Sequence, residues 1–355
     1  MHTQVPSIEP LDSAAAEAAR QRQSRLTKPP GSLGLLETVA VRLAAIQCRE
    51  QPRIEHPRGL LFAADHGVTA HHAVSPYPRQ VTAQMVANIA GGGSASAALA
   101  TAADASLEIV DVGVDGPLPP WTTTDGIDFV SARVRPGSRD FTAEPAMEPA
   151  EFDAALQVGL DAAARAHRAG ATVVALGEMG IGNTTTATAV TCALTGRAVQ
   201  DVVGPGTGAD AQMQQTKAEV VTRALAQHEP ARDEPLEILR TVGGLELAAL
   251  AGATLGAAHH RIAVIADGFI CTAAVAAAVR AHPNAAGYVF HGHRSAVPGH
   301  RVLLDGMEAT PLLDLSLRLG EGTGALLAIP LLRAAAMTHG TMATFDAAGV
   351  DDRSE

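Results

Sequence analysis

The sequence predicts an α/β protein with a doubly wound, mostly parallel sheet. Short apolar runs with the length of buried strands recur along the chain, and each ends in a Gly-rich or charged turn. Most of these runs are followed by an Ala-rich helical stretch, and strands that alternate with helices form right-handed βαβ units. Aromatic residues make up only 3% of the chain, which favours closely packed helices on a sheet over an aromatic-rich sandwich.

Length and charge narrow the class of protein. A chain of 355 residues can bury one large core, or one core and a small satellite domain. The net charge of −11 disfavours nucleic acid or an anionic membrane as a partner. The first ten residues show no signal peptide, and no apolar run is a convincing membrane span. We therefore expect a cytoplasmic protein, in which Cys48, Cys192 and Cys271 are buried thiols.

The N-terminal region predicts two helices before any strand. The first runs from Ser13 to Arg25 with Ser13 as its candidate N-cap, and it must end before Pro29-Pro30, which cannot continue a helix. A second helix follows, with one apolar face made by Leu36, Val39, Leu43 and Ile46. Two helices ahead of the first strand indicate a small helical lobe outside the sheet.

Five apolar runs are the candidate strands. They are residues 60–64, Leu107 to Val114, Thr172 to Leu176, Arg261 to Ala266 and Tyr288 to His291. The intervening segment from Pro117 to Pro149 is rich in Pro, Thr and Asp, and we expect it to be irregular or an edge strand. In parallel sheets ligands bind outside the carboxyl ends of the strands, so the polar turns after these runs are the places to look for a site.

The richest of these turns covers residues 177–186, with the sequence Gly-Glu-Met-Gly-Ile-Gly-Asn-Thr-Thr-Thr. A Gly-rich turn that opens a helix presents free amides and the positive end of the helix dipole, which suits a phosphate. The turn imitates a dinucleotide-binding motif, but Thr185 occupies the third glycine position and Glu178 leads the loop. A mononucleotide phosphate site is therefore favoured. The alternative is a tight strand-to-helix turn capped by Asn183.

Two further segments carry candidate ligand groups. Lys217 follows the glycine-dense loop 204–208 and is a candidate phosphate cation, although a solvated surface lysine is the commoner case. The same alternative applies to Lys28. Residues 75–78 (Ser-Pro-Tyr-Pro), with Gln84 and Met85, are candidates for a slot that holds a flat heteroaromatic ring, or else form a proline-stiffened loop with Tyr77 packed down.

The histidines near the last strand are not arranged as metal ligands. His291, His293 and His300 lie close in sequence, but the companions expected at a zinc site, such as a His-Glu-x-x-His motif, are absent. We expect a hydrogen-bonded polar turn there, together with Arg294 and Ser295. No metal is predicted.

Glu321 stands between Gly320 and Gly322, immediately before an apolar run that extends to Leu332. Burial without a neighbouring cation raises the pKa of a carboxyl group and makes its carboxylate a stronger base. The alternative is a helix-start glutamate favoured by the helix dipole, with glycines that merely form a turn.

Several of these segments, in this order, resemble one enzyme family. They are Lys28 to Gly34, Ala64 to Val68, Gly177 to Thr185, Gly206 to Gly208, Gly243 to Glu246, Asp267 to Ile270, His293 to Ala296 and Leu319 to Gly324. The chain resembles the nicotinate-nucleotide–dimethylbenzimidazole phosphoribosyltransferases over roughly residues 25–346. The resemblance implies a Rossmann-like large domain (59–320) and a small helical domain made by residues 1–50 and completed by 321–355. It also implies a homodimer with the active site near the subunit interface.

The resemblance further implies a reaction that needs neither cofactor nor metal. Ribose 5-phosphate passes from nicotinate mononucleotide to 5,6-dimethylbenzimidazole with inversion, giving nicotinate and α-ribazole 5'-phosphate for the nucleotide loop of cobalamin. Glu321 would be the base, and Glu178 would bind ribose hydroxyls or support the cationic transition state. The phosphate and ribose would be held by Gly180, Gly182, Asn183, Thr184, Gly206, Lys217 and Ser295, and the benzimidazole by Tyr77, Gln84, Met179 and Leu319.

Two other classes stay open on the sequence. One is a nucleotide-dependent oxidoreductase that uses the loop from Gly180 to Thr185, and the other is a non-catalytic nucleotide-binding protein on the same fold. Val297 departs from the resemblance, since an acidic residue is expected after Ser295-Ala296.

Overall fold

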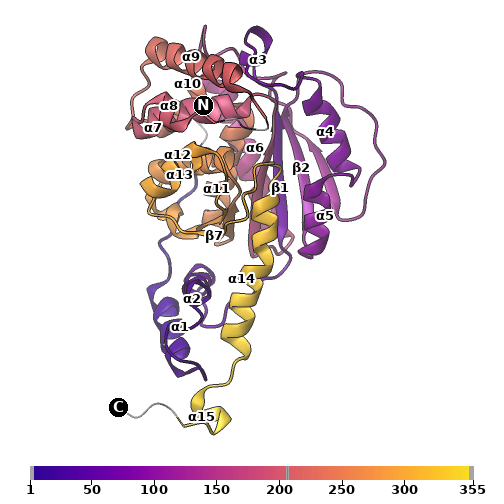
Figure 1. Cartoon of the computed structure of the whole chain (residues 1–355). Coiled ribbons are helices and arrows are strands. Elements are labelled where there is room, and N and C mark those ends of the chain that lie inside the picture. The colour runs from indigo at the N-terminus through magenta and orange to yellow at the C-terminus, as the bar shows by residue number, and fades with distance from the viewer. Residues whose placement is uncertain (1–3, 205, 207, 352–355) are drawn as a thin grey trace.

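The computed structural model describes residues 4–204, 206 and 208–351, and in this part of the chain seven strands form one sheet (Figure 1). The sheet has the order β3-β2-β1-β4-β5-β6-β7. Every neighbouring pair is parallel. The strands are β1 (Arg58–Ala64), β2 (Ser106–Gly113), β3 (Ile127–Ser131), β4 (Val173–Met179), β5 (Ala263–Ala266), β6 (Val289–His293) and β7 (Pro311–Leu313). The fold class predicted from the sequence is confirmed.

The two edge strands and the ends of two inner strands can now be compared with the predictions. The edge strand expected between Pro117 and Pro149 is β3. The other edge strand, β7, was not predicted, because its three residues are too short to show a period. Strand β4 extends to Met179, which places Glu178 on the strand itself. Tyr288 belongs to the 3-10 helix η1 (Pro283–Tyr288), so the last predicted strand begins one residue later.

Helices cover both faces of the sheet. On one face α4 (Val81–Ala90), α5 (Ala95–Ala102) and α14 (Thr323–Thr341) contact the strands, and on the other α11 (Leu245–His259) packs across β1, β2, β4 and β5 between α6 (Pro149–Arg168) and α12 (Phe269–Ala281). Apart from the two N-terminal helices, the other α-helices are α3 (Val68–His71), α7 (Asn183–Thr195), α8 (Val199–Val202), α9 (Ala211–His228), α10 (Pro235–Val242), α13 (Pro298–Gly306) and α15 (Phe345–Ala348).

Two N-terminal helices form a separate lobe with the end of α14. Helix α1 (Ser13–Arg25) packs on α2 (Leu35–Gln47), and the long α14 extends from the sheet to α2 (Figure 1). Arg22 donates hydrogen bonds to the carbonyl oxygens of His339 and Gly340 at 2.7 and 2.9 Å. The N-cap of α1 is Asp12 and not Ser13, since the Asp12 carboxylate accepts from the Ala15 amide at 2.8 Å. The division into two domains stays a prediction.

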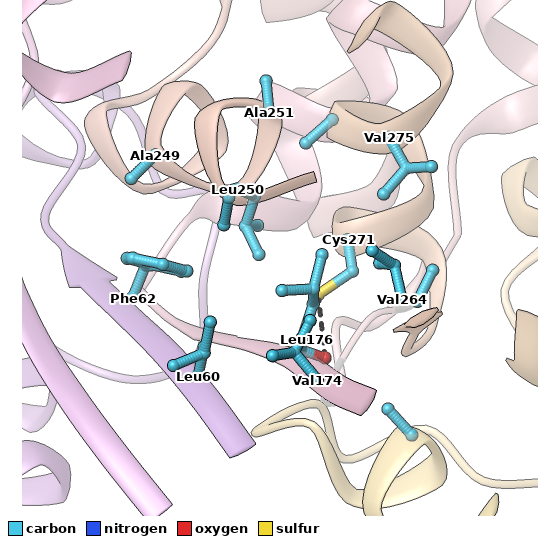
Figure 2. Packing of buried hydrophobic residues seen from close by; sticks show 14 of the residues in the cluster. Leu60, Phe62, Val174, Leu176, Ala249, Leu250, Ala251, Val264, Cys271 and Val275 are labelled. Carbon is cyan, nitrogen blue, oxygen red and sulfur yellow. Dashed lines mark hydrogen bonds between the residues drawn. The ribbon is translucent and has the colours of Figure 1, made fainter. Parts of the chain in front are cut away.

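The core covers both faces of the sheet, and part of it lies between the sheet and helices α11 and α12. Figure 2 shows Phe62 of β1 and Leu176 of β4 beneath Leu250 of α11 and Cys271 of α12. The Cys271 thiol donates to the Leu176 carbonyl oxygen at 3.6 Å. Cys192 is also buried, as expected, but Cys48 is exposed because it is the C-cap of α2, with φ of 52°, beyond the buried face of that helix.

The strand order reverses between β1 and β4. The chain runs outward from β1 to β2 and β3 in one direction and from β4 to β7 in the other. In a doubly wound sheet ligands bind at this reversal, outside the carboxyl ends of the strands. Among the described residues, no helix combines the length and apolarity needed to cross a membrane.

Candidate active site

A cavity of about 90 Å³ opens at the carboxyl ends of β4, β5 and β6. It is lined by the loop after β4, the residues after β5 and β6, and the turn that precedes α14. A larger cavity of about 440 Å³ lies between α2, α12 and β6, but its walls are mostly apolar and none of the predicted site residues lines it. The smaller cavity is therefore the candidate active site.

The structure brings most of the predicted site residues to this cavity. Those that line it are Glu178, Met179, Gly180, Gly182, Asn183, Thr184, Gly206, Lys217, Ser295, Leu319 and Glu321. Tyr77 and Gln84 do not line it; both are exposed, and the Tyr77 side chain retains 48% of its accessible surface. Their neighbours Ser75 and Pro76 do reach the cavity.

Glu321 is held in an unusual backbone conformation. Gly320, Glu321 and Gly322 all have positive φ, at 88°, 59° and 72°. For a glutamate this region is unfavourable, and such strain is commonly found at functional sites. Position 320 favours glycine because of its positive φ, and a Cβ there would lie 2.6 Å from the Glu178 Oε1 atom, so the Glu178 side chain would have to shift. Gly320 therefore leaves room for the Glu178 carboxyl group beside the turn that holds Glu321.

The Glu321 carboxyl group is buried, with 5% of the residue exposed. Burial raises its pKa above the ordinary value, and the negative charge of Asp267 adds to that effect. The Ser96 hydroxyl, which donates to Glu321 Oε2 at 3.4 Å, acts in the opposite direction. A desolvated carboxylate with a raised pKa is a suitable general base.

Glu178, the last residue but one of β4, is also buried. Burial, reinforced by the negative charges of Asp267 and Glu246, raises the pKa of Glu178 to about 8. The Asn183 side-chain amide donates a hydrogen bond to Glu178 Oε2. Asn183 is the first residue of α7 and does not cap it; the N-cap is Gly182, with φ of 95°. The carboxyl group of Glu178 thus faces a cavity in which a cationic ligand would favour its ionised form.

Another part of the cavity lining suits an anion. The N-terminus of α7 opens onto it, and Lys217 of α9 reaches it from the side, with Nζ 3.1 Å from the Thr184 hydroxyl. Lys217 is 3% exposed, so it is not a solvated surface lysine. Burial lowers its pKa to about 8. A buried ammonium beside a helix N-terminus is the arrangement expected for a phosphate. Pro205 and Thr207 of the second glycine loop lie outside the described residues.

Lys28 is also buried, and its role is structural. Its ammonium group forms an ion pair with Glu37 of α2 at 2.8 Å, within the N-terminal lobe. Burial of Lys28 is thus compensated locally, whereas Lys217 has a hydroxyl group as its neighbour.

The predicted histidine cluster forms a structural turn. The His300 Nδ1 atom accepts from the Ser295 amide at 2.9 Å, and its Nε2 atom lies 3.1 Å from the Thr272 hydroxyl. Burial lowers the pKa of His300 to about 3 and that of His291 to about 4, so both rings are neutral. Among the described residues, no group of three or more His, Cys, Asp or Glu side chains could hold a metal ion. The neutral His300 ring therefore fixes the backbone of Ser295.

Two polar residues that follow strands make contacts at the site that the sequence did not indicate. His66, after β1, is fully buried, with Nε2 2.7 Å from Glu246 Oε1 and Nδ1 3.1 Å from the Thr186 hydroxyl. This network supports the Gly180 loop, where a Cβ would lie 2.4 Å from the Ala64 carbonyl oxygen. Asp267, after β5, lines the cavity directly. Both residues followed predicted strands, but their partners are remote in sequence.

Val297 is buried at the edge of the cavity and is the N-cap residue of α13. Its side chain packs against Gly204, where a Cβ would lie 3.1 Å from Val297 Cγ1. An apolar side chain therefore fits where the resemblance led us to expect an acidic one.

The chain is similar to known phosphoribosyltransferases over nearly its whole length. A phosphoribosyltransferase family model matches residues 8–350. The chain is 48% identical over 347 residues to the nicotinate-nucleotide–dimethylbenzimidazole phosphoribosyltransferase of a Pseudomonas putida strain, covering 98% of this chain and 97% of the relative. It is 49% identical over 346 residues to the Pseudomonas fluorescens enzyme of the same name, covering 97% and 96%.

Solved structures agree with the sequence comparison. A crystal structure of the Thermus thermophilus enzyme of that name superposes with a TM-score of 0.90 and 45% identity, covering 97% of this chain and all of that one. Sequence and structure are similar over nearly the whole length. The chain therefore belongs to the nicotinate-nucleotide–dimethylbenzimidazole phosphoribosyltransferase family.

Proposed function

We propose that this protein transfers ribose 5-phosphate from nicotinate mononucleotide to 5,6-dimethylbenzimidazole, which supplies the lower-ligand nucleotide of cobalamin. One observation carries the proposal: a buried glutamate, Glu321, lines the same cavity as the buried cation Lys217. The cavity thus combines a candidate general base with a candidate phosphate site. Membership in the family supplies the substrates.

The chemistry requires one base and no acid. In nicotinate mononucleotide the ring nitrogen is quaternary, so nicotinate leaves with the electrons of the C1'–N bond and needs no proton. The free nitrogen of dimethylbenzimidazole attacks C1' from the opposite face, which inverts the configuration. Its other nitrogen loses a proton, and Glu321 accepts it. Burial of Glu321 keeps water away from the reacting centre and keeps the carboxylate basic.

The remaining residues bind and orient the substrates. Lys217 and the α7 amides hold the phosphate, with Gly180, Gly182, Asn183, Thr184, Gly206 and Ser295 around the ribose and phosphate. Glu178 faces the cationic centre, where the positive charge of the pyridinium favours the carboxylate form. Met179 and Leu319 form walls for the benzimidazole. Tyr77 and Gln84, exposed in the single chain, would complete that slot only when covered by substrate or a partner.

A homodimer fits this last requirement. Tyr77, Leu315 and Leu319 are large apolar side chains that are about half exposed, and Leu319 lines the cavity. Leu319, exposed at the cavity, is a candidate contact for a partner subunit. We propose a cytoplasmic homodimer with two domains per chain, residues 59–320 forming the larger one. The three free cysteines are in keeping with a reducing compartment.

The decisive experiment is a direct assay. The purified protein is incubated with nicotinate mononucleotide and dimethylbenzimidazole, and α-ribazole 5'-phosphate is sought by mass spectrometry. Absence of product across pH and temperature would overturn the proposal. Tight binding of NAD in calorimetry, with no transfer, would instead favour an oxidoreductase. Thr185 at the third glycine position of the loop argues against that class.

Replacing Lys217 by alanine is expected to raise the apparent KM for nicotinate mononucleotide by about tenfold or more, because a charge-assisted phosphate contact is lost. The KM for dimethylbenzimidazole should change little. Steady-state kinetics with each substrate varied in turn measure both effects. Lys28→Ala, which removes a buried lysine of the N-terminal lobe, is the matched control. An unchanged KM for the nucleotide in Lys217→Ala would exclude Lys217 from the phosphate site.

The pH dependence should reflect the raised pKa of Glu321. A general base is active only when deprotonated, so kcat/KM should fall as the pH drops through that pKa. Because the free-enzyme pKa is raised, the fall should begin above the ordinary titration range of a glutamate. The measurement is kcat/KM between about pH 4 and 9. An acidic limb at or below the ordinary glutamate pKa would contradict the assigned environment.

A further inference from the structure

Asp267 links the end of β5 to the start of the helix that follows Glu321. It is 1% exposed, and its Oδ1 atom accepts from the Gly324 amide at 2.7 Å and the Ala325 amide at 3.1 Å. These are amides of the first turn of α14, which have no partner within the helix. His293 Nε2 lies 3.4 Å from the same oxygen. The Asp267 side chain thus connects the first turn of α14 to the end of β5 through two hydrogen bonds.

These hydrogen bonds lie next to a segment with an unfavourable backbone conformation, residues 320–322. Glu321 has φ of 59°, and an unfavourable conformation of this kind persists only where neighbouring structure holds it. The Thr323 amide and hydroxyl both donate to the Gly320 carbonyl oxygen, at 3.1 and 2.9 Å, but these bonds close the turn on itself. The hydrogen bonds that Asp267 accepts from Gly324 and Ala325 connect the turn to the end of β5.

The charge of Asp267 is also placed among other charged groups of the site. Glu178 of β4, Glu246 of α11, His293 of β6 and Glu321 face this region from the elements packed around it. The Asp267 charge raises the pKa of Glu178 and that of Glu321. Its removal should therefore make Glu321 a weaker base even if the turn keeps its place.

We propose that Asp267 is a positioning residue for the transfer reaction, which holds Glu321 in its reactive place by accepting the first free amides of α14. The inference rests on the proposed function, since it concerns the base of that reaction. Asp267 acts through Glu321 and takes no proton itself. The sequence placed Asp267 at a strand end without indicating this partner.

Two variants distinguish the effect of Asp267 on the position of Glu321 from the effect of its negative charge. Asp267→Ala removes both hydrogen bonds to α14, and a base displaced by about 1 Å can cost about 10² in rate, so kcat should fall by roughly that factor. The KM for nicotinate mononucleotide should stay within about threefold, because the phosphate site is untouched. Asp267→Asn keeps an oxygen that can accept both amides, so it should recover most of kcat. With the charge removed, its acidic kcat/KM limb should move to lower pH.

Asp12→Ala is the matched control. Asp12 caps α1 through the Ala15 amide at 2.8 Å, so its loss weakens a helix N-terminus outside the cavity. We expect Asp12→Ala to lower the melting temperature of the protein. Its kcat, and the pH at which kcat/KM falls on the acidic side, should equal those of the wild type. The same assays are run on the full-length wild-type chain, whose activity tests the proposed function independently of Asp267.

Two results would overturn the inference. One is wild-type kcat in Asp267→Ala. The other is an Asp267→Asn variant that is as inactive as Asp267→Ala, or whose acidic limb does not move. If Asp267→Ala does not fold, the Asp267→Asn rate and pH profile decide alone. Failure of the wild-type chain to form product would instead overturn the proposed function.

Discussion

Replacing Glu321 by glutamine is expected to lower turnover by about 10²-fold or more while the protein stays folded. Glutamine keeps the size of the side chain and a group that can meet Ser96, but it cannot accept the proton of the incoming benzimidazole. The loss should appear in kcat, because the base acts in the transition state and not in binding of the nucleotide. Steady-state kinetics and circular dichroism measure the two parts of the prediction.

A second glutamate provides the control. Glu308 also has a positive φ, at 52°, but it is exposed and lies outside the candidate active site. Glu308→Gln should therefore retain wild-type turnover. Near-wild-type turnover in Glu321→Gln would remove Glu321 as the base. A Glu321→Ala variant whose activity rises when formate is added would support the assignment further, since a small carboxylate could occupy the vacated space.

Replacing Gly159 by alanine is expected to lower the free energy of unfolding by about 3 kcal/mol or more. Gly159 lies on α6 where that helix crosses α11, and a Cβ there would be 1.9 Å from the Ala249 carbonyl oxygen and 2.5 Å from the Ala253 amide nitrogen. Those atoms are backbone atoms of a fully buried helix, so they cannot move aside at low cost. The steric cost should exceed the gain of up to about 1 kcal/mol from the higher helix propensity of alanine.

Urea denaturation of Gly159→Ala and the wild-type chain measures this effect. The matched control is Gly306→Ala in α13, where nothing lies within 4 Å of the added Cβ. That variant should be as stable as the wild type or slightly more stable. Equal stability of the two variants would show that α6 and α11 are not in backbone contact at Gly159. Gly252 of α11, whose Cβ would lie 2.0 Å from the Leu156 carbonyl oxygen, offers an independent repeat.

Several features of the site could be predicted from local sequence alone. A carboxylate between two glycines, and a Gly-rich turn between a strand and a helix, are local patterns with local physical meaning. They led to Glu321 and to the loop from Gly180 to Thr184, both of which line the cavity. The resemblance to a known family then supplied the reaction, which neither pattern specifies by itself.

Other features depended on contacts between distant segments. Lys217 could be a surface lysine until the fold buried it beside Thr184. Tyr77 and Gln84 matched an aromatic slot by composition, yet the single chain leaves both exposed. Asp267 was visible as a polar strand end, but its hydrogen bonds to the start of α14 span 57 residues or more.

The sequence by itself determined the class of the fold, because the alternation of apolar runs and helices is a local periodicity that only a parallel α/β arrangement satisfies. The tertiary structure decided the strand order β3-β2-β1-β4-β5-β6-β7, and with it the reversal between β1 and β4 and the cavity at the carboxyl ends of β4, β5 and β6. It also decided the basicity of Glu321. That property follows from burial and from groups as remote as Ser96, 225 residues away in the chain, and desolvation arises only when such segments pack together.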